Sequence, residues 1–247
     1  SGSLPAPSSA GASGAGGPKT AATDNATGQL SSAISGNRRL VREGRTRFIQ
    51  SRRQMRGDSA GISSRNTVDF EFDGTLNATN GYISSQGAFF QQDGNFEGTA
   101  RRVLFGDFDI QRSSDTGSTT ATFTGKMAWE RMLDEQNMIG YYVGADVARS
   151  NIKGTYTGEQ DTYGVSVGTY FVSALQENLF VDGFVSLGVG KNDLTLADGT
   201  VDLNGDFNSR SVTLGTALTG VIKQEGYEIW PELAFTYGKT RLGTIGM

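Results

Sequence analysis

The sequence predicts an all-β protein, an antiparallel up-and-down meander that forms a transmembrane β-barrel, preceded by a short helical, basic segment and a disordered linker. Three observations predict this fold. Residues 1–37 are mostly Gly, Ala, Ser and Pro, eight arginines follow within residues 38–56, and apolar residues recur at every second position from residue 67. We therefore divide the chain into a flexible linker at 1–37, a basic linker or lumen helix at 38–66, and barrel strands at 67–247.

The first zone has low sequence complexity, because 26 of its 37 residues are Gly, Ala, Ser or Pro. Such a segment buries too little apolar surface to offset the entropy that is lost when it becomes ordered. We expect a flexible tether. A tether joins two bodies, so the sequence also leads us to expect a partner domain upstream.

The second zone is strongly basic. Within residues 36–56 the eight arginines are accompanied by a single acidic residue, Glu43, which gives a local charge of +7 in a chain of formal net charge −4. Leu40, Val41 and Phe48 fit one stripe of a helix. Three interpretations stay open: a solvated basic helix or arm, a contact with nucleic acid or an anionic membrane, and a segment lying against an acidic surface of the same molecule. The arginines are Arg38, Arg39, Arg42, Arg45, Arg47, Arg52, Arg53 and Arg56.

The third zone has the period of β-strands. Between residues 163 and 171, Tyr, Val, Val, Thr and Phe alternate with Gly, Ser, Gly and Tyr, and residues 139–147 repeat the pattern. This alternation gives each strand two different faces. Turn dipeptides such as Asp73-Gly74 separate the runs. The expected strands lie near 67–73, 81–91, 95–112, 116–132, 138–150, 161–173, 178–190, 207–224 and 226–240.

Strand length favours a membrane barrel over a soluble sandwich. Soluble strands usually run about 5 or 6 residues, whereas a tilted strand that crosses a bilayer needs roughly 9 to 11, and most of the expected strands reach that length. The apolar face of a barrel contacts lipid, so we expect Val143, Val165, Val185, Leu214 and Leu233 to point outward, whereas a sandwich would bury them. The aromatic residues expected near strand ends, as interfacial girdles, are Tyr141, Tyr142, Tyr156, Phe180, Tyr227, Trp230 and Tyr237.

Composition excludes several classes of function. The chain has no Cys and no His, which rules out disulfide frameworks, thiolate nucleophiles, the common zinc sites and Ser-His-Asp triads. A pI near 5.0 argues against a protein built for nucleic acid. No apolar run approaches the roughly 20 residues of a membrane-spanning helix. The chain also opens without a signal peptide, so we expect a processed product or an internal fragment.

Acidic residues are the remaining candidates for chemistry. Asp107 and Asp109 lie two positions apart on one face of an expected strand, a separation of about 7 Å that suits acid–base hydrolysis. Asp202, Asn204 and Asp206 have the spacing of the first ligands of a calcium loop, but no Glu follows at the twelfth position. We interpret both groups as ordinary lumen, surface or loop charges. We expect no enzymatic activity, no cofactor and no metal.

Four runs resemble a known family. These are MIGYYVGAD at 138–146, DTYGVSVGTYF at 161–171, NLFVDGF at 178–184 and WPELAFTY at 230–237. They are similar to the autotransporter (type V secretion) β-domain of Gram-negative outer membranes, and the similarity covers roughly residues 120–240. The resemblance implies a twelve-stranded barrel with an α-helical segment through its lumen, placed after a secreted passenger and inserted by the outer-membrane assembly machinery.

The sequence departs from the family in two respects. The family ends in an aromatic residue, whereas this sequence ends in Leu-Gly-Thr-Ile-Gly-Met. About nine strands is also an odd number, and such barrels have an even number. Three explanations stay open: a barrel truncated at the C-terminus by about three strands, a barrel smaller than the family's, and a related barrel with another role. We favour truncation.

These observations predict an outer-membrane barrel that anchors an upstream passenger and helps to translocate it. The basic segment would occupy the pore, because inward carboxylates attract it and a confined lumen screens charges less than a surface does. The inward candidates are Asp107, Asp109, Asp146, Asp182, Glu228 and Glu232, and the plug candidates are the eight arginines named above. The implied partners are outer-membrane lipid, the assembly machinery and the passenger, with no nucleic acid. The alternative is a soluble β-sandwich or barrel, such as an adhesin or fibre-type binding module, whose basic arm contacts a partner.

Overall fold

The computed structural model describes residues 18–56, 66–77, 82–94, 99–113, 118–153, 157–197, 202–224 and 227–244. Residues 1–17 of the expected linker and Tyr156 lie outside these ranges. The elements are α1 (Pro18–Met55), β1 (Asn66–Asn77), β2 (Tyr82–Gly94), β3 (Ala100–Ser113), β4 (Thr119–Met132), β5 (Asn137–Ile152), β6 (Thr157–Gln176), β7 (Leu179–Ala197), β8 (Asp202–Gly220), β9 (Ile222–Gln224), β10 (Tyr227–Ile229) and β11 (Glu232–Leu242).

The strands form an antiparallel meander, as the alternation predicts. Nine of them make one sheet in the order β1-β2-β3-β4-β5-β6-β7-β8-β11. The turn expected at Asp73-Gly74 is wrong, because both residues pair with β2 inside β1. The last two expected strands also differ in detail from the observed ones. The strand expected at 226–240 is interrupted at Pro231, which has no N–H to donate to a ladder. The residues before it pair with β9 in a separate two-stranded hairpin, and β11 begins at Glu232.

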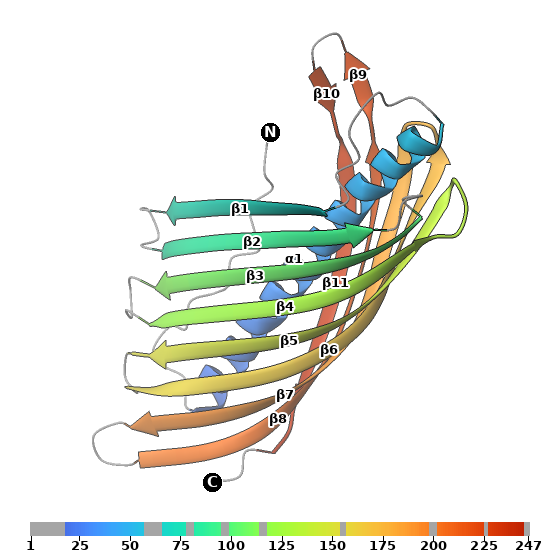
Figure 1. The fold of residues 1–247 in the computed structure, drawn as a ribbon. Helices are drawn as coiled ribbons and strands as arrows, with labels where there is room; N and C mark the ends of the chain where they lie inside the picture. Colours follow the sequence, from blue (N-terminus) through green and yellow to red (C-terminus); the bar gives the residue numbers. More distant parts are fainter. Residues whose placement is uncertain are drawn as a thin grey trace.

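The sheet curves around α1 (Figure 1). The helix contacts β3 to β8 and also β11, strands that are far apart in the order of the sheet. β1 and β11 are the two edges of the sheet, and no ladder joins them among the described strands. Within the described residues no helix is both long and apolar enough to span a membrane.

The helix begins at Pro18, so residues 18–37, which we expected to belong to a flexible linker, are helical. Proline is well suited to the first position of a helix. Tertiary contacts then stabilise a segment whose composition alone does not favour order. The side-chain amide of Asn25 donates a hydrogen bond to Gln160, and that of Gln29 donates one to Thr162.

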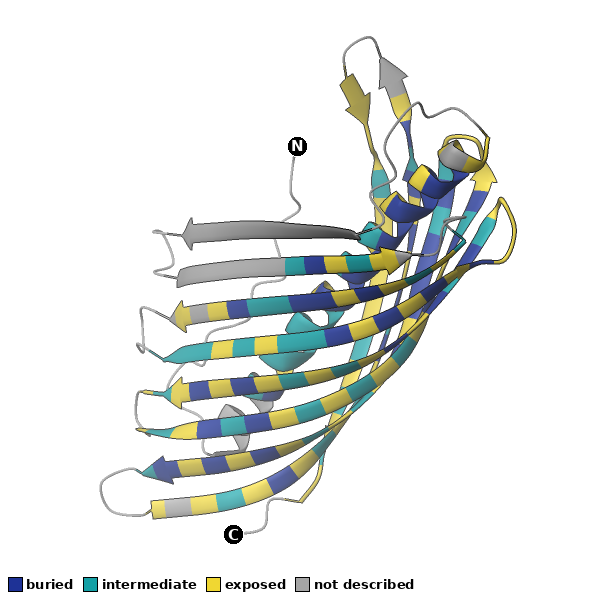
Figure 2. Cartoon of the chain, in the orientation of Figure 1, coloured by how far each residue is buried: buried dark blue, intermediate teal, exposed yellow. Residues whose placement is uncertain are grey.

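Strands β3 to β8 have two faces that differ in burial, which Figure 2 shows as stripes along these strands. The inner face packs on the predicted helical stripe, Leu40, Val41 and Phe48, whose side chains have no exposed surface. Aromatic and aliphatic residues of β2 to β7 complete this core. They are Phe90, Val103, Phe105, Ala128, Met132, Met138, Tyr142, Tyr170, Val172, Ala174, Phe180 and Phe184.

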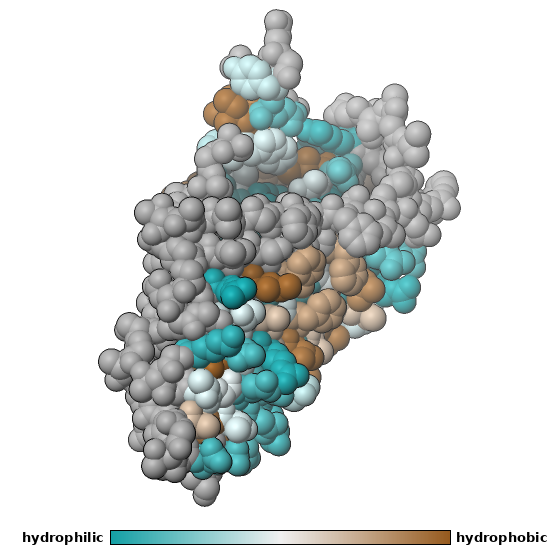
Figure 3. Space-filling model, turned by 90° about the vertical axis from the view of Figure 1, so that its left-hand side faces the viewer, coloured by the Kyte–Doolittle hydropathy of each residue, from teal (hydrophilic) through white to brown (hydrophobic). Residues whose placement is uncertain are grey.

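The outer face carries exposed apolar side chains. Val165 is 56% exposed and Leu233 is 77% exposed, and Val143 and Val185 are also exposed. Leu214 is intermediate. In Figure 3, which views one side of the molecule, apolar residues gather in the middle and hydrophilic residues lie at the margins. The residues predicted to point outward therefore do not form the core.

Two of the expected girdle residues lie inside the sheet. Tyr142 and Phe180 are buried in the core, whereas Tyr141, Tyr227, Trp230 and Tyr237 are exposed. The cause is the alternation itself, because Tyr142 follows the outward Tyr141 by one position and must face inward. The prediction that Tyr142 and Phe180 belong to the interfacial girdles is therefore wrong, because it used only their aromatic character and not their position in the alternation.

Glycines on the inner face make room for these aromatic rings. Tyr170 stands directly opposite Gly140, and Tyr142 stands directly opposite Gly168. A Cβ atom built on either glycine would overlap the ring of its partner. Such close packing on a neighbouring strand is available only to a residue without a side chain, and it accounts for part of the high glycine content.

Candidate functional site

Several ion pairs lie at the interface between α1 and the inner face of the sheet. Arg38 and Arg45 lie two turns apart on the same face of α1. Arg38 binds Asp182 of β7 at 3.0 Å and Glu232 of β11 at 2.5 Å. Arg45 binds the same two carboxylates, at 2.6 and 2.8 Å, and also donates to Thr219 at 2.6 Å. Two guanidinium groups and two carboxylates therefore join the helix to β7 and β11.

A second cluster joins α1 to β4. Arg47 donates two bonds to Glu130, one from Nε to Oε2 at 3.1 Å and one from Nη2 to Oε1 at 2.5 Å. The hydroxyl of Tyr170 donates to the same carboxylate at 2.7 Å. Both charged side chains are buried. Gly44 permits this approach, because a Cβ there would lie 3.1 Å from the Tyr170 ring.

A third cluster is centred on a neutral side chain of the helix. The Asn37 oxygen accepts hydrogen bonds from the Lys126 ammonium at 2.6 Å and from the Tyr142 hydroxyl at 2.8 Å. Its amide group donates to Thr213 at 3.1 Å. Lys126 also lies over the Phe105 and Tyr142 rings, 5.6 and 5.5 Å from their centroids. Asn37 thus links β4, β5 and β8 through one residue of α1.

The other predicted arginines contact the wall less closely. Arg39 binds Asp107 at 3.3 Å, and the exposed Arg42 approaches Glu232 at 4.0 Å. Arg53 approaches Glu228 at 3.6 Å, and both of these side chains are substantially exposed. The pairs of Arg42 and Arg53 contribute little, since exposed ion pairs typically stabilise a protein by about 0 to 1 kcal/mol.

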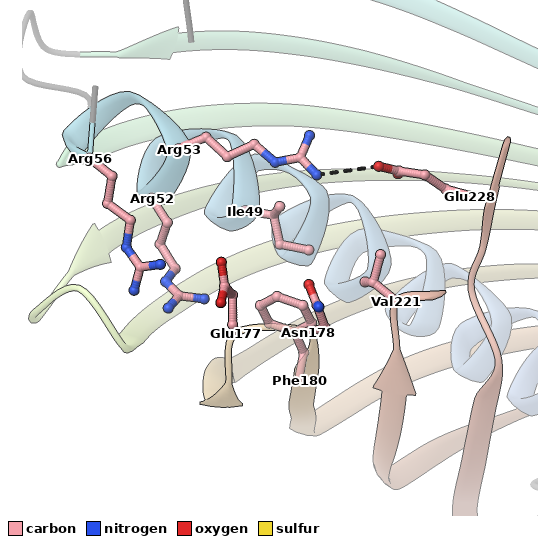
Figure 4. Close-up of a pocket in the computed structure, with 9 residues that line it drawn as sticks. All are labelled: Ile49, Arg52, Arg53, Arg56, Glu177, Asn178, Phe180, Val221 and Glu228. Atoms are coloured by element: carbon pink, nitrogen blue, oxygen red, sulfur yellow. Dashed lines mark ion pairs between the residues drawn. The ribbon is translucent and has the colours of Figure 1, made fainter. Parts of the chain in front are cut away.

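A pocket of about 460 Å³ lies at the C-terminal end of α1 (Figure 4). The Arg52 guanidinium lies there over the rings of Phe48 and Phe180, 5.7 and 5.9 Å from their centroids. Within the described part of the chain, Arg52 and Arg56 form no ion pair. Their position suits the negative end of the helix dipole, which favours cations in the last turn.

The remaining acidic candidates also lie on the inner face of the sheet. Asp109 is buried on the inner face of β3. Asp146 is half-buried on the inner face of β5, opposite Gly164, and a Cβ on that glycine would overlap the carboxylate. Asp107 and Asp146 both act electrostatically on Lys126. The described residues contain no group of three or more His, Cys, Asp or Glu side chains that could hold a metal ion.

Reasoning from the sequence missed Glu130, Lys126, Asn37 and the inward role of Tyr170. The signal for Glu130 and Lys126 was present, because alternation along β4 places both on the face opposite to the outward Met127 and Trp129, which lie between them in the sequence. No sequence signal marked Asn37, since its side chain is uncharged and an argument from charge attraction could not predict its contacts.

Comparisons with known proteins give few matches. No family model and no curated protein matches the sequence. Among solved structures, the ferripyoverdine receptor of the outer membrane of Pseudomonas aeruginosa, bound to ferripyoverdine, has a TM-score of 0.39 and 10% identity, over 74% of this chain and 29% of that chain. FpvA of P. aeruginosa with a heterologous pyoverdine has a TM-score of 0.38 and 12% identity, over 71% of this chain and 28% of that chain.

The FpvAI–pyocin S2 complex also has a TM-score of 0.38, with 10% identity, over 72% of this chain and 29% of that chain. The chain thus spans less than a third of the length of these structures. Because TM-scores below 0.5 do not establish a common fold, we infer the function of this chain from its own residues.

Proposed function

We propose that the chain is an outer-membrane β-barrel domain that anchors an upstream passenger and helps to translocate it, with α1 occupying the pore. The observation that carries the proposal is the inverted distribution of side chains on the curved sheet. Large apolar residues are exposed on the outside, while charged residues are buried inside against a basic helix. A soluble protein normally has the opposite arrangement.

The height of the apolar band supports a membrane-spanning wall. On β6 the outward positions from Tyr163 to Phe171 are apolar except for Thr169, and on β5 those from Ile139 to Val147 are all apolar. Each of these stretches spans nine residues, close to the roughly 9 to 11 that a tilted strand needs to cross a bilayer. Charged residues such as Arg149 and Lys191 stand just beyond the band.

The soluble alternative requires something to cover this band. An adhesin or fibre module would have to bury the apolar face against a second sheet. In the described residues that face packs against no other element, while the opposite face packs against α1. In a membrane, the lipid acyl chains contact such an apolar outer face, so no second protein layer is required.

The ion pairs of α1 support its role as a plug. Burying a guanidinium–carboxylate pair is favourable only when its geometry and hydrogen bonding are good, and the pairs of Arg45 and Arg47 satisfy this condition. Because Asp182, Glu232 and Glu130 are all occupied by arginines of the helix, we propose that they hold α1 in place and have no catalytic role. The resemblance to autotransporter domains supports the roles of the passenger and of the assembly machinery.

Folding from urea tests the membrane part of the proposal. The chain should acquire strong β circular dichroism only when detergent micelles or lipid vesicles are added, and its unboiled gel band should migrate differently from its boiled band. A folded, soluble monomer in the absence of amphiphile would overturn the proposal.

Planar-bilayer conductance tests the plug. Neutralising Asp182 and Glu232 together should open the pore and raise the conductance, whereas Glu228→Gln, which alters only an exposed pair, should leave the conductance unchanged. Equal conductance in all three proteins would show that α1 does not block the lumen.

A further inference from the structure

Four cations gather on the outer face of the sheet at one end of the apolar band. They are Lys191 of β7, Arg210 of β8, and Lys239 and Arg241 of β11, and we call them the basic rim. All four are exposed. Lys239 stands opposite Val212, an exposed residue of the band, so the charges begin at the margin of the apolar surface.

The charges of the basic rim are poorly compensated. Arg210 and Arg241 stand directly opposite each other in the ladder between β8 and β11, an arrangement in which like charges repel. Within the described residues neither of them, nor Lys239, forms an ion pair, whereas Lys191 pairs with Asp193 at 3.2 Å. Arg149, at the same end of β5, has both Glu159 and Asp161 as partners. The cations of the basic rim are therefore less neutralised by the protein than Arg149 is, which favours the binding of an external anion.

A groove of about 410 Å³ adjoins the rim on the outer face of β6 to β8. Lys191 and Arg210 stand at its basic margin, and Tyr163, Val165 and Val189 are its exposed apolar lining. A ligand that fits such a groove has an anionic group beside a long apolar tail. Guanidinium groups bind phosphate oxygens through paired hydrogen bonds, so a phosphate between the two arginines would relieve their repulsion.

We propose that the basic rim binds the phosphate headgroup of an anionic membrane lipid, whose acyl chain lies along Val165 and Val189. This inference rests on the proposed function, because it requires the apolar band to be embedded in lipid. Two arguments favour a lipid over a soluble anion. The groove continues the lipid-facing band, and its apolar lining offers nothing to an anion without a tail.

The test uses the full chain refolded in a zwitterionic detergent, with bound lipid counted by native mass spectrometry. Phosphatidylglycerol is compared with phosphatidylcholine of the same acyl chains, and inorganic phosphate is added as a competitor. The variant is R210Q/R241Q. The matched control is R102Q/R131Q, which removes two exposed cations of β3 and β4 at the other end of the sheet.

The unmodified chain should retain phosphatidylglycerol in preference to phosphatidylcholine. R210Q/R241Q should bind phosphatidylglycerol roughly 30-fold more weakly, the loss expected for two cations at an anionic bilayer surface, and the control should bind it normally. Equal retention of the two lipids, equal losses in the two variants, or displacement by inorganic phosphate at the concentration of the lipid would each overturn the inference. A heat-shifted gel band measured on the same samples shows whether the chain has inserted. An inserted chain without lipid preference refutes this inference alone, and a chain that never inserts refutes the proposed function.

Discussion

The carboxylate of Glu130 in β4 accepts two hydrogen bonds from Arg47 of α1, and both side chains are buried. Removing one partner leaves an uncompensated charge inside the protein. Glu130→Ala should therefore lower the free energy of unfolding by roughly 3 to 5 kcal/mol.

The double variant R47M/E130M should recover most of that loss, because an apolar pair of similar volume often replaces a buried ion pair at little cost. Urea unfolding in detergent, followed by circular dichroism, measures both effects. Strictly additive effects of R47A and E130A in the double alanine variant would show that the two side chains are not coupled.

Asp182 should matter more to the position of α1 than Glu228 does. Asp182 has no exposed surface and binds both Arg38 and Arg45, whereas Glu228 binds one exposed arginine. Asp182→Asn should destabilise the fold by roughly 3 kcal/mol, and Glu228→Gln by at most about 1 kcal/mol. Limited proteolysis reports the detachment of α1 directly, and equal cleavage rates in the two variants would contradict this ranking.

The packing of Tyr170 on Gly140 predicts a steric effect. Gly140→Ala should destabilise the protein by roughly 1 to 3 kcal/mol, because the added methyl group meets the ring. Gly125→Ala on the neighbouring strand is the control, since a Cβ there meets nothing within 4 Å. Thermal unfolding of the two variants distinguishes them, and identical midpoints would mean that the ring is free to move aside.

A charge on the lipid-facing band should have an effect that depends on depth. Val165→Arg should lower the free energy of folding into vesicles by roughly 2 to 4 kcal/mol, and Asn151→Arg, near the end of β5, by at most about 1 kcal/mol. Equilibrium folding into vesicles of one lipid measures the difference. A soluble protein whose outer face is in water would tolerate both substitutions equally.

The turn between β4 and β5 gives a prediction about pH. The side-chain amide of Asn137 and then the backbone N–H of Gln136 donate to the exposed Asp134 carboxylate, and these bonds lower its pKa. A folded-state pKa below the unfolded one adds stability that is present above the unfolded pKa and is lost as pH falls through the folded pKa. An NMR titration of Asp134 should show the lowered pKa, and Asn137→Ala should raise it part of the way towards the usual value, because the backbone N–H of Gln136 still donates to the carboxylate.

Much of the fold could be predicted because alternation is a local signal. The order and number of strands in the main sheet follow from period two, and Val165 and Leu233 point outward as that period requires. The turn dipeptide Asp73-Gly74 was a poorer signal, since it lies inside β1. The helix at residues 18–37 could not be predicted from composition, since its order depends on contacts such as that of Asn25 with Gln160, a residue distant in the sequence.

The sequence predicted that the arginines of the helix would attract the inward acids of the wall, but it did not predict the individual ion pairs. The arginine run and the isolated acids Asp182 and Glu232 predicted an attraction between helix and wall. Which acid meets which arginine depends on the curvature of the sheet and on the rotation of the helix, and neither is encoded locally. Glu130 was overlooked although alternation alone places it on the inner face of β4, where it accepts hydrogen bonds from the buried Arg47.

The most direct test of a membrane-spanning wall uses the absence of native cysteine. Single cysteines at Val165 and at its neighbour Ser166 can carry an environment-sensitive fluorophore in the chain folded into vesicles. We expect a quencher attached to the lipid acyl chains to quench the probe at position 165 and to spare the probe at position 166. Equal quenching by a water-soluble agent at both positions, with none from the lipid, would contradict a membrane-spanning wall around α1.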